Sequence, residues 1–489
     1  MMKHAPNTVR IVLAVATVAT VFFGIAVVAL NFGTPVGQPT SADVSSTTQA
    51  SPDSSAAGSS EPTTSSPRTE ATSPDTIELA EPSLRGIGAP NTTSSSSTPA
   101  STQAKPPPET KPTPTTQPKP TTTQPAPTTA APPAQGAPDG AVIVNPGDDI
   151  QRLVNQNPAG TTFYLRAGVH QGPGRGSHVD PKSGNTFIGE PGAIMDGGGS
   201  TIYAFQDNMK GTNVTIRGLI IQNYANPAQR GAIDAVSDGW RIIGNEIRNN
   251  RGAGVNLIGN SWVIEGNNIH HNAQIGVKGQ GSGGRVVSNT IANNNPNRAY
   301  DWAWEAGGTK FVKTTNLYVA GNRVLNNLGP GLWTDGDNRG TTYENNIVRD
   351  NAGPGIFHEI SFSAVIRNNT VTGNAHPFYL GGILVANSSD VTVTGNTLSG
   401  NDGGIVGLQD SRGGYNTVNL NVTGNAVSHS SGVTGLVYNS GTDVAATGSI
   451  RFDNNSYQVG GDRPFAWKGG SRTIAEWQGL GQDLNSSFN

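Results

Sequence analysis

The sequence predicts an all-β solenoid over residues 141–489, and two observations lead to this prediction. The first is a phrase that recurs between Asn245 and Asn425: an apolar pair, a small residue, then Asn-x-[Ile/Val/Leu]-x-x-Asn. It reads IIGNEIRNN, VIEGNNIHHN, VVSNTIANN, YVAGNRVLNN, YENNIVRDN, VIRNNTVTGN and VTVTGNTLSGN, with a worn copy, VTGNAVSHS. The second is the period, because Asn245, Asn267 and Asn289 are 22 residues apart and most later steps are somewhat longer. A fixed period near this value is typical of solenoids.

Each repeat is too short to contain a full helix, and it holds two or three apolar alternations split by Gly-Asn. This pattern predicts short strands and bends, so the fold is expected to be a parallel β-helix. The first Asn of each phrase follows a small residue at a bend, where Asn tolerates left-handed backbone. We expect these Asn side chains to form an inward ladder with coils about 4.8 Å apart. They are Asn245, Asn267, Asn289, Asn322, Asn346, Asn369, Asn396 and Asn425.

Residues 11–30 carry no charge and no proline. A helix of this length spans a hydrocarbon core of about 30 Å. Because Lys3 and Arg10 precede it and the first later acid is Asp43, residues 1–10 should be cytoplasmic and the rest of the chain extracellular. The alternative is a cleaved signal peptide, but its apolar region is usually only about 7–15 residues. We therefore expect a single-pass signal anchor in the cell membrane.

Residues 31–140 are dominated by Ser, Thr, Pro and Ala. Almost nothing in them can be buried, so we expect a disordered, semi-stiff linker. Such a spacer between an anchor and a folded domain suits a bacterial, Gram-positive cell wall. The chain has no cysteine and a net charge of −3, which argues against disulfides and against nucleic acid as a partner. We expect a monomer.

The folded domain opens with a short strand and then Asp148-Asp149, which can cap a helix bearing Ile150, Leu153 and Val154 on one face. The segment TTFYLRAG then predicts a strand. A solenoid needs a cover at its open end. We expect this segment to form an N-terminal helical cap.

The repeat resembles the single-stranded right-handed parallel β-helix of the pectate-lyase-like superfamily, over nearly all of residues 141–489. Residues 471–486, SRTIAEWQGLGQDLNS, resemble the closing segment of such bacterial proteins. Members of this superfamily include polysaccharide lyases, glycoside hydrolases, mannuronan C5-epimerases and non-catalytic binding or spike proteins. None of the extended local motifs of pectate lyases or polygalacturonases is present, so no catalytic set can be transferred.

Alignment of the strand after each Asn phrase predicts two columns on the outer face, because side chains alternate along a strand. Charged residues make up only 13% of the chain, yet several gather in these columns. This gathering indicates either a functional site or, alternatively, a set of ion pairs on a solvated sheet. One column reads Asp234, Asn256, Lys278, Lys310, Trp333 and Phe357, and the other Val236, Ile258, Gln280, Val312, Asp335 and Glu359.

Asp335 and Glu359 should lie on adjacent coils, where two carboxylates raise each other's pKa or bind a cation. With Asp337 in the loose acidic turn DGDNRG, they are the candidate ligands for Ca²⁺. Lys278, Lys310, Asp335 and Glu359 are the candidate catalytic residues. His358 is a further candidate; alternation places it inward, and a bulge would be needed to turn it out.

The step from Asn289 to Asn322 is 33 residues, which indicates an added loop at about residues 295–308. Long loops in compact coils are usually functional, and aromatic side chains suit stacking on sugars. Trp302, Trp304 and Glu305 of this loop are therefore candidate substrate-binding residues, together with Trp333 and Asp234. The alternative is a loop that buries its own aromatics.

The resemblance favours a lyase or C5-epimerase acting on a uronic-acid-containing polysaccharide or cell-wall glycan, with Lys310 or Lys278 as the base. A glycoside hydrolase using Asp335 and Glu359 is a close alternative. A non-catalytic glycan-binding domain on a stalk is the alternative from another class.

Overall fold

The computed structural model describes residues 136–172, 174, 178–207, 211–375, 381–438, 440–447 and 449–489. The predicted membrane anchor at residues 11–30 and the linker up to residue 135 lie outside these described residues. Within the described ranges, no helix is both long and apolar enough to cross a bilayer.

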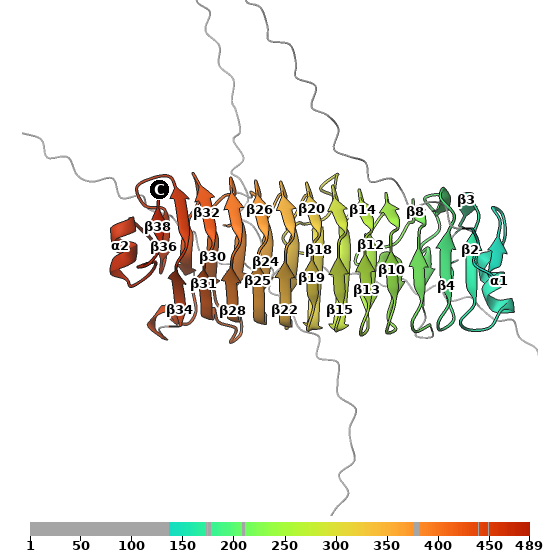
Figure 1. Cartoon of the computed structure of the whole chain (residues 1–489), viewed down its shortest axis with the longest axis horizontal. Helices are drawn as coiled ribbons and strands as arrows, with labels where there is room; N and C mark the ends of the chain where they lie inside the picture. Colours follow the sequence, from blue (N-terminus) through green and yellow to red (C-terminus); the bar gives the residue numbers. More distant parts are fainter. Residues whose placement is uncertain are drawn as a thin grey trace, which may run out of the picture. The chain divides into compact units, whose positions relative to one another are not determined.

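Residues 141–489 form the predicted parallel β-solenoid, in which each regular coil contributes one strand to each of three columns (Figure 1). Columns 1 and 2 together with β37 (Gly470–Arg472) make up a 25-stranded sheet, and column 3 makes up a 13-stranded sheet over the described residues. Column 1 contains β6 (Phe205–Gln206), β9 (Gly231–Ala235), β12 (Ala253–Ile258), β15 (Ile275–Ser282), β18 (Gly307–Thr315), β21 (Leu332–Asp335), β24 (Ile356–Glu359), β27 (Ile383–Ala386), β30 (Ile405–Gln409), β33 (Thr434–Tyr438) and β36 (Phe465–Trp467).

The other two columns complete the coils. Column 2 contains β1 (Val142–Val144), β2 (Thr162–Leu165), β4 (Thr186–Gly189), β7 (Thr215–Arg217), β10 (Arg241–Ile243), β13 (Val263–Glu265), β16 (Arg285–Val287), β19 (Tyr318–Ala320), β22 (Arg339–Glu344), β25 (Phe362–Arg367), β28 (Ser389–Thr394), β31 (Val418–Thr423) and β34 (Ile450–Asp453). Column 3 contains β3 (Gly168–Gln171), β5 (Ala193–Asp196), β8 (Ile220–Gln222), β11 (Glu246–Arg248), β14 (Asn268–His270), β17 (Thr290–Ala292), β20 (Arg323–Leu325), β23 (Ile347–Arg349), β26 (Thr370–Thr372), β29 (Thr397–Ser399), β32 (Ala426–His429), β35 (Ser456–Val459) and β38 (Ser487–Phe488).

The strand register in column 1 matches the alignment made from the sequence. Asn256 pairs with Lys278, and Lys278 pairs with Lys310 on the next coil. Asp335 pairs in turn with Glu359. The only irregularity among these pairs is a shift between Gly279 and Gly281, where β18 holds one extra residue. The period of the Asn phrase therefore sets the register, because every strand pairs with its copy one coil away.

The Asn ladder is confirmed, and it is longer than predicted. From Asn267 onward, each side-chain oxygen accepts hydrogen bonds from the backbone N–H and the Nδ2 of the Asn one coil before; for Asn346 the donor atoms of Asn322 lie at 3.0 and 2.9 Å. The ladder continues through Asn455, whose Nδ2 donates to the Asp483 carboxylate at 3.0 Å. Buried amides satisfy one another and the bend carbonyls, which removes the cost of leaving them unpaired.

A second Asn ladder, which the repeated phrase did not lead us to expect, runs along the bend before column 1. In it, Asn327 donates from both its backbone N–H and its Nδ2 to Asn351 Oδ1, at 3.0 and 2.9 Å. Its signal was the second Asn of the repeated phrase. Its members within the described residues are Asn250, Asn272, Asn294, Asn327, Asn351, Asn374 and Asn401.

The interior of the coils is filled with stacked apolar side chains. Trp240 and Trp262 are fully buried and pack this interior. Phe163 stacks on Phe187 with ring centroids 5.1 Å apart, and Trp262 stacks on Phe311 at 6.2 Å. Because the coils repeat, similar side chains stack on one another from coil to coil, and the hydrophobic core is continuous along the solenoid.

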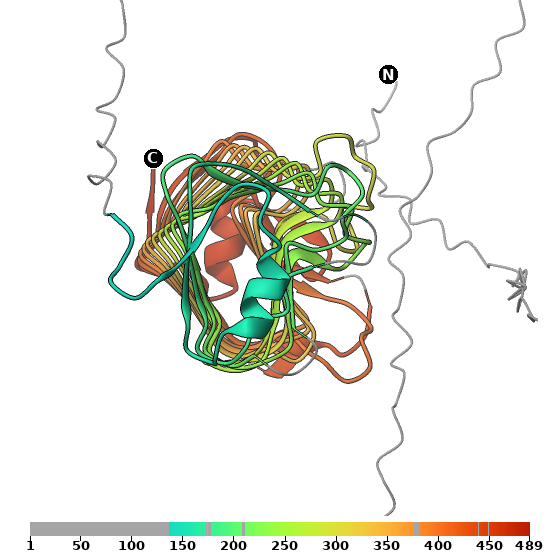
Figure 2. The same cartoon turned by 90° about the vertical axis from the view of Figure 1, so that its right-hand side faces the viewer.

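Short helices lie at the two ends of the coils. Helix α1 (Ile150–Gln156) begins after Asp149, whose side chain accepts from Arg152 N at 2.9 Å. Figure 2 shows α1 in front of the stacked coils. At the other end, α2 (Ile474–Gly479) begins with a capping box of Thr473 and Glu476, and β37 (Gly470–Arg472) pairs antiparallel with β36. A 3-10 turn, η1 (Val444–Thr447), connects β33 to β34.

Candidate functional site

The outer face of column 1 brings the predicted charged residues together, but it is not a solvated sheet. Asp234 is fully buried and Lys310 is only 3% exposed. Two loops contact this face: the long loop (residues 293–306) and the second loop (residues 410–417). In Figure 2, a yellow loop and an orange loop extend beyond the stacked coils in these two regions of the sequence. The charged residues therefore pair within a partly enclosed layer, not on an open surface.

Asp234 lies at the upstream end of this layer. Its Oδ1 forms an ion pair with Arg230 Nη2 at 2.7 Å. Its Oδ2 accepts from the Gly231 N–H at 2.7 Å and from Asn256 Nδ2 at 3.1 Å. Burial raises the pKa of Asp234, while Arg230 lowers it. Asp234 is thus held in place by several donors.

Lys278 follows on the same column. Its Nζ lies 2.8 Å from Glu305 Oε2, and it also donates to the side-chain oxygen of Gln229. Glu305 belongs to the long loop, as predicted. Burial lowers the pKa of Lys278, and the Glu305 carboxylate opposes that shift.

Lys310 is the next lysine. Its Nζ lies 2.8 Å from Asp335 Oδ2, and it donates to the backbone carbonyl of Trp304 at 2.5 Å. The same ammonium lies 4.0 Å from the centroid of the Trp333 ring. The Lys310 side chain thus packs against a carboxylate, a carbonyl and an aromatic face.

Glu359 completes the cluster. Its Oε1 lies 3.0 Å from Arg412 Nη2, and its Oε2 accepts from Trp333 Nε1 at 3.2 Å. Burial raises the pKa of Glu359 to about 8, and the neighbouring charge of Asp335 adds to the shift. Arg412 and Lys310 act in the opposite direction without cancelling it. Burial and the charge of Asp335 therefore favour the protonated form of Glu359, against its ion pair with Arg412.

Comparison with known proteins identifies the repeat. Residues 231–381 match the family model described as a right handed beta helix region. The coils form a right-handed parallel β-helix. The match covers the coils that contain the charged layer.

Several solved structures are similar to this β-helix protein. The A-module of a mannuronan C-5 epimerase from Azotobacter vinelandii is 17% identical, with a TM-score of 0.46, and the match covers 73% of this chain and 98% of that one. A GH87 α-1,3-glucanase catalytic unit from Streptomyces thermodiastaticus is 13% identical, with a TM-score of 0.47, over 73% of this chain and 70% of that one. Among curated proteins no match is found. The chemistry of the protein must therefore be inferred from its own residues.

Two of the predicted site residues do not reach a ligand-binding surface. His358 is fully buried inside the coil, where Nδ1 lies 2.7 Å from the Thr334 hydroxyl. No bulge turns it outward, so His358 does not face the outer layer with the other candidate residues. Trp333 is 2% exposed and stacks on Phe357 at 5.4 Å. It packs the outer face with Leu384 and Val406 and does not present its ring to solvent.

The long loop places its predicted residues differently. Trp304 is 53% exposed, whereas Glu305 and Trp302 are partly buried. Trp302, Tyr300 and Arg298 line a hollow of about 200 Å³ on the loop. The loop thus does both things that the sequence allowed: it encloses part of its aromatic surface and leaves Trp304 in solvent.

The three predicted calcium ligands have different partners in the protein. Asp335 pairs with Lys310 and Glu359 with Arg412. Asp337 Oδ1 accepts from the Tyr415 hydroxyl at 2.7 Å. Within the part of the chain that the structure describes, no three His, Asp or Glu side chains gather as a metal site would require. Each of the three carboxyl groups is thus bound to a side chain of the protein itself, and they do not converge on one point.

Sequence reasoning missed Arg230, Arg412 and Tyr415, which contact the predicted residues. Arg412 lies 53 residues beyond Glu359, in the second loop. None of the three falls in the repeated phrase or in the aligned strand positions. Their only signal was the presence of polar residues in irregular segments, which does not specify a contact.

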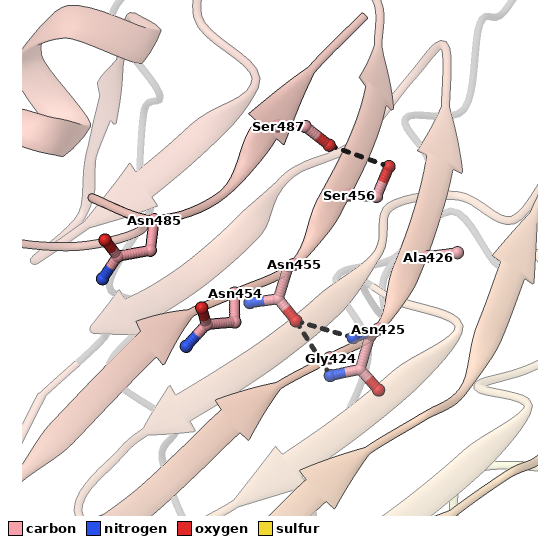
Figure 3. A pocket seen from close by; sticks show the side chains of 8 residues that line it. All are labelled: Gly424, Asn425, Ala426, Asn454, Asn455, Ser456, Asn485 and Ser487. Carbon is pink, nitrogen blue, oxygen red and sulfur yellow. Dashed lines mark hydrogen bonds between the residues drawn. The ribbon is translucent and has the colours of Figure 1, made fainter.

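Shallow hollows also occur at bends away from the charged layer. One of about 340 Å³ lies beside the first Asn ladder near its downstream end, and Figure 3 shows its lining residues. Asn425 donates there to Asn455, and Ser487 to Ser456. This hollow contains no ionisable side chain.

Proposed function

We propose that this β-helix protein is a glycan-active enzyme that uses Glu359 as a general acid and Asp335 as its carboxylate partner, in a glycoside hydrolase reaction. One observation leads to this proposal. Two carboxyl groups on adjacent coils lie in different environments: Glu359 is buried, which raises its pKa to about 8, whereas Asp335 is partly exposed and forms an ion pair with Lys310. Pairs whose environments separate their protonation states are typical of acid–base catalysis on sugars.

The exposure of the cluster supports an approach from the side of the long loop. The Asp335 side chain is 24% exposed, and Trp304, whose carbonyl binds Lys310, is 53% exposed. A sugar ring stacked on Trp304 would lie close to the Lys310–Asp335 pair. Aromatic stacking of this kind binds sugars through their apolar faces.

A lyase or epimerase on a uronic-acid-containing polysaccharide is the second candidate. The contacts of Lys310 argue against it as the base, since its ammonium is bound by a carboxylate, a carbonyl and an aromatic ring. Lys278 is the better base, because burial lowers its pKa and so favours the neutral amine.

We also propose that the enzyme acts outside the cell, anchored by residues 11–30 and spaced from the membrane by the Ser/Thr/Pro-rich linker. The positive residues before the apolar run and the absence of acids until Asp43 support this orientation.

The acid assignment is tested with Glu359→Gln and Asp335→Asn, assayed on a panel of neutral and uronic glycans. Loss of a general acid should lower kcat by a factor of about 10²–10⁴. The wild-type rate should fall as pH rises through about 8, because Glu359 then loses its proton. New reducing ends without an unsaturated product indicate a hydrolase.

Glu344→Gln is the matched control, because Glu344 forms an ion pair with Arg367 on column 2 at 3.0 Å, outside the cluster. It should leave kcat unchanged. Formation of an unsaturated or epimerised product that depends on Lys278 would favour the second candidate. A folded wild type that turns over none of the glycans would remove the enzyme assignment.

A further inference from the structure

We infer that Lys278 is an anion-recognising residue of the ligand-binding face and that Glu305 of the long loop is its built-in competitor. Glu305 would occupy the position on Lys278 that a carboxylate or sulfate of the glycan takes when it binds. The inference rests on the proposed function only in taking the outer face of column 1 as the ligand-binding surface.

Two consecutive residues of the long loop, Trp304 and Glu305, contact two lysines on neighbouring coils of column 1. Glu305 Oε2 lies 2.8 Å from Lys278 Nζ, and the carbonyl of Trp304 accepts from Lys310 Nζ. Lys278 and Lys310 are register partners on neighbouring coils, so the loop contacts two successive positions of one column. A polymer lying along the solenoid axis would meet the same two positions.

The charges of the layer show what the loop contributes. Four cations, Arg230, Lys278, Lys310 and Arg412, pair with four acids, Asp234, Glu305, Asp335 and Glu359. With the loop in place, these four ion pairs balance one another. Withdrawal of Glu305 leaves one net positive charge, and burial of Glu359, which favours its neutral form, adds to this excess. The layer is therefore cationic toward a ligand that displaces the loop.

Desolvation makes this excess charge consequential. The Lys278 side chain is 13% exposed and the Lys310 side chain 4%. A buried ammonium that loses its carboxylate partner is costly unless another anion replaces it. An anionic group on the ligand satisfies this requirement, whereas a neutral sugar hydroxyl does so only in part.

The remaining contacts keep the loop near this position. The Tyr300 hydroxyl donates to the carbonyl of Arg251 at 3.1 Å. Asn295 Nδ2 donates to the carbonyls of Tyr300 and Leu328 at 3.1 and 2.9 Å. These bonds do not involve Glu305. Exchange of the Glu305 carboxylate for a ligand anion can therefore occur without release of the Asn295 and Tyr300 contacts.

The test is direct binding by the full chain to a polyuronate, a sulfated glycan and a neutral glucan, with wild type, Glu305→Gln and Lys278→Gln. Glu305→Gln removes the competing charge and keeps the side-chain size. It should tighten binding of at least one anionic polymer about fivefold, equivalent to about 1 kcal/mol, and leave neutral glucan unchanged. Lys278→Gln should weaken the same anionic polymer by a similar factor and abolish the effect of Glu305→Gln in the double variant.

If Glu305→Gln tightens binding of the polyuronate, the recognised group is a carboxylate; if it tightens binding of the sulfated glycan, the group is a sulfate. Added salt should weaken binding of the anionic polymer, because the charges of the free polymer are exposed and are screened. Glu344→Gln should change no affinity. Weaker or unchanged anion binding by Glu305→Gln would show that the ion pair only holds the loop, and would overturn the inference. Turnover that is lost in Glu359→Gln would still support the proposed function in that case, whereas a protein that binds no polymer in any variant would contradict both.

Discussion

At the scale of single residues, His358 shows how burial sets protonation. It lies inside the coil between its register partners Thr334 and Val385, and burial lowers its pKa to about 3. The folded protein therefore keeps His358 neutral, while the unfolded chain takes up a proton below the ordinary value of 6.5. Stability is full above pH 6.5 and declines as the pH falls toward about 3. His358→Val, matched to Val385, should remove this acid-side decline, as measured by denaturant midpoints between pH 3 and pH 7.

Other carboxylates also titrate in that range, so the difference between variant and wild type is the relevant quantity. Asp453 is an example, since the side-chain amide of Asn485 and further donors hold its pKa near 2. If the midpoints of His358→Val fall as steeply with acid as those of wild type, His358 is not the group responsible.

At the scale of elements, the Asn ladders fix the bends between strands. Asn346 accepts from the backbone and side chain of Asn322, and its Nδ2 donates to the Val319 carbonyl at 2.9 Å and to Asn369. Asn346→Ala leaves buried donors and an acceptor unpaired, each at a cost of about 1–3 kcal/mol. We expect a loss of about 3 kcal/mol in the free energy of unfolding, measured by chemical denaturation. Asn268→Ala, at an exposed position on β14, is the control and should change stability by less than about 0.5 kcal/mol.

A loss as small as that of Asn268→Ala would mean that neighbouring coils close over the gap.

The ladder was predictable because its Asn recurs at a bend with a small residue before it. The second ladder was equally visible in the phrase, but its Asn ends the phrase instead of opening it. Its position just before column 1 became clear only when the strands were placed.

At the scale of the whole molecule, the sequence divides into an apolar run, a long polar linker and a β-helix. We expect the β-helix to be released from intact cells by an added protease that cuts in the linker, with residues 1–30 left in the membrane fraction. The measurement uses a tag at each end of the chain, detected separately in the medium and in the membrane fraction. Recovery in the medium, without added protease, of a chain that lacks its N-terminal tag would indicate cleavage near residues 27–29 and contradict the anchor. A β-helix protected from protease in intact cells would contradict the orientation.

Much of the fold could be predicted from the sequence, because each coil of a solenoid repeats the same local sequence pattern. The spacing of Asn245, Asn267 and Asn289 was enough to align Lys278 with Lys310 and Asp335 with Glu359, and the strand register agrees. Alternation likewise placed His358 inside. In each case the contact is between residues one coil apart, and the period supplies that distance.

The spacing of the repeat did not predict how exposed these side chains are or which residues from other segments contact them. The groups that cover column 1 come from irregular segments far along the chain: Gln229 lies 49 residues from Lys278, and Arg412 lies 53 from Glu359. No period relates them, so only packing in three dimensions brings them together. These segments enclose what the pattern describes as an open face, and they contact Lys310 and Glu359 there. The repeat thus specifies which residues share a column, and the loops that fold over it determine what those residues can do.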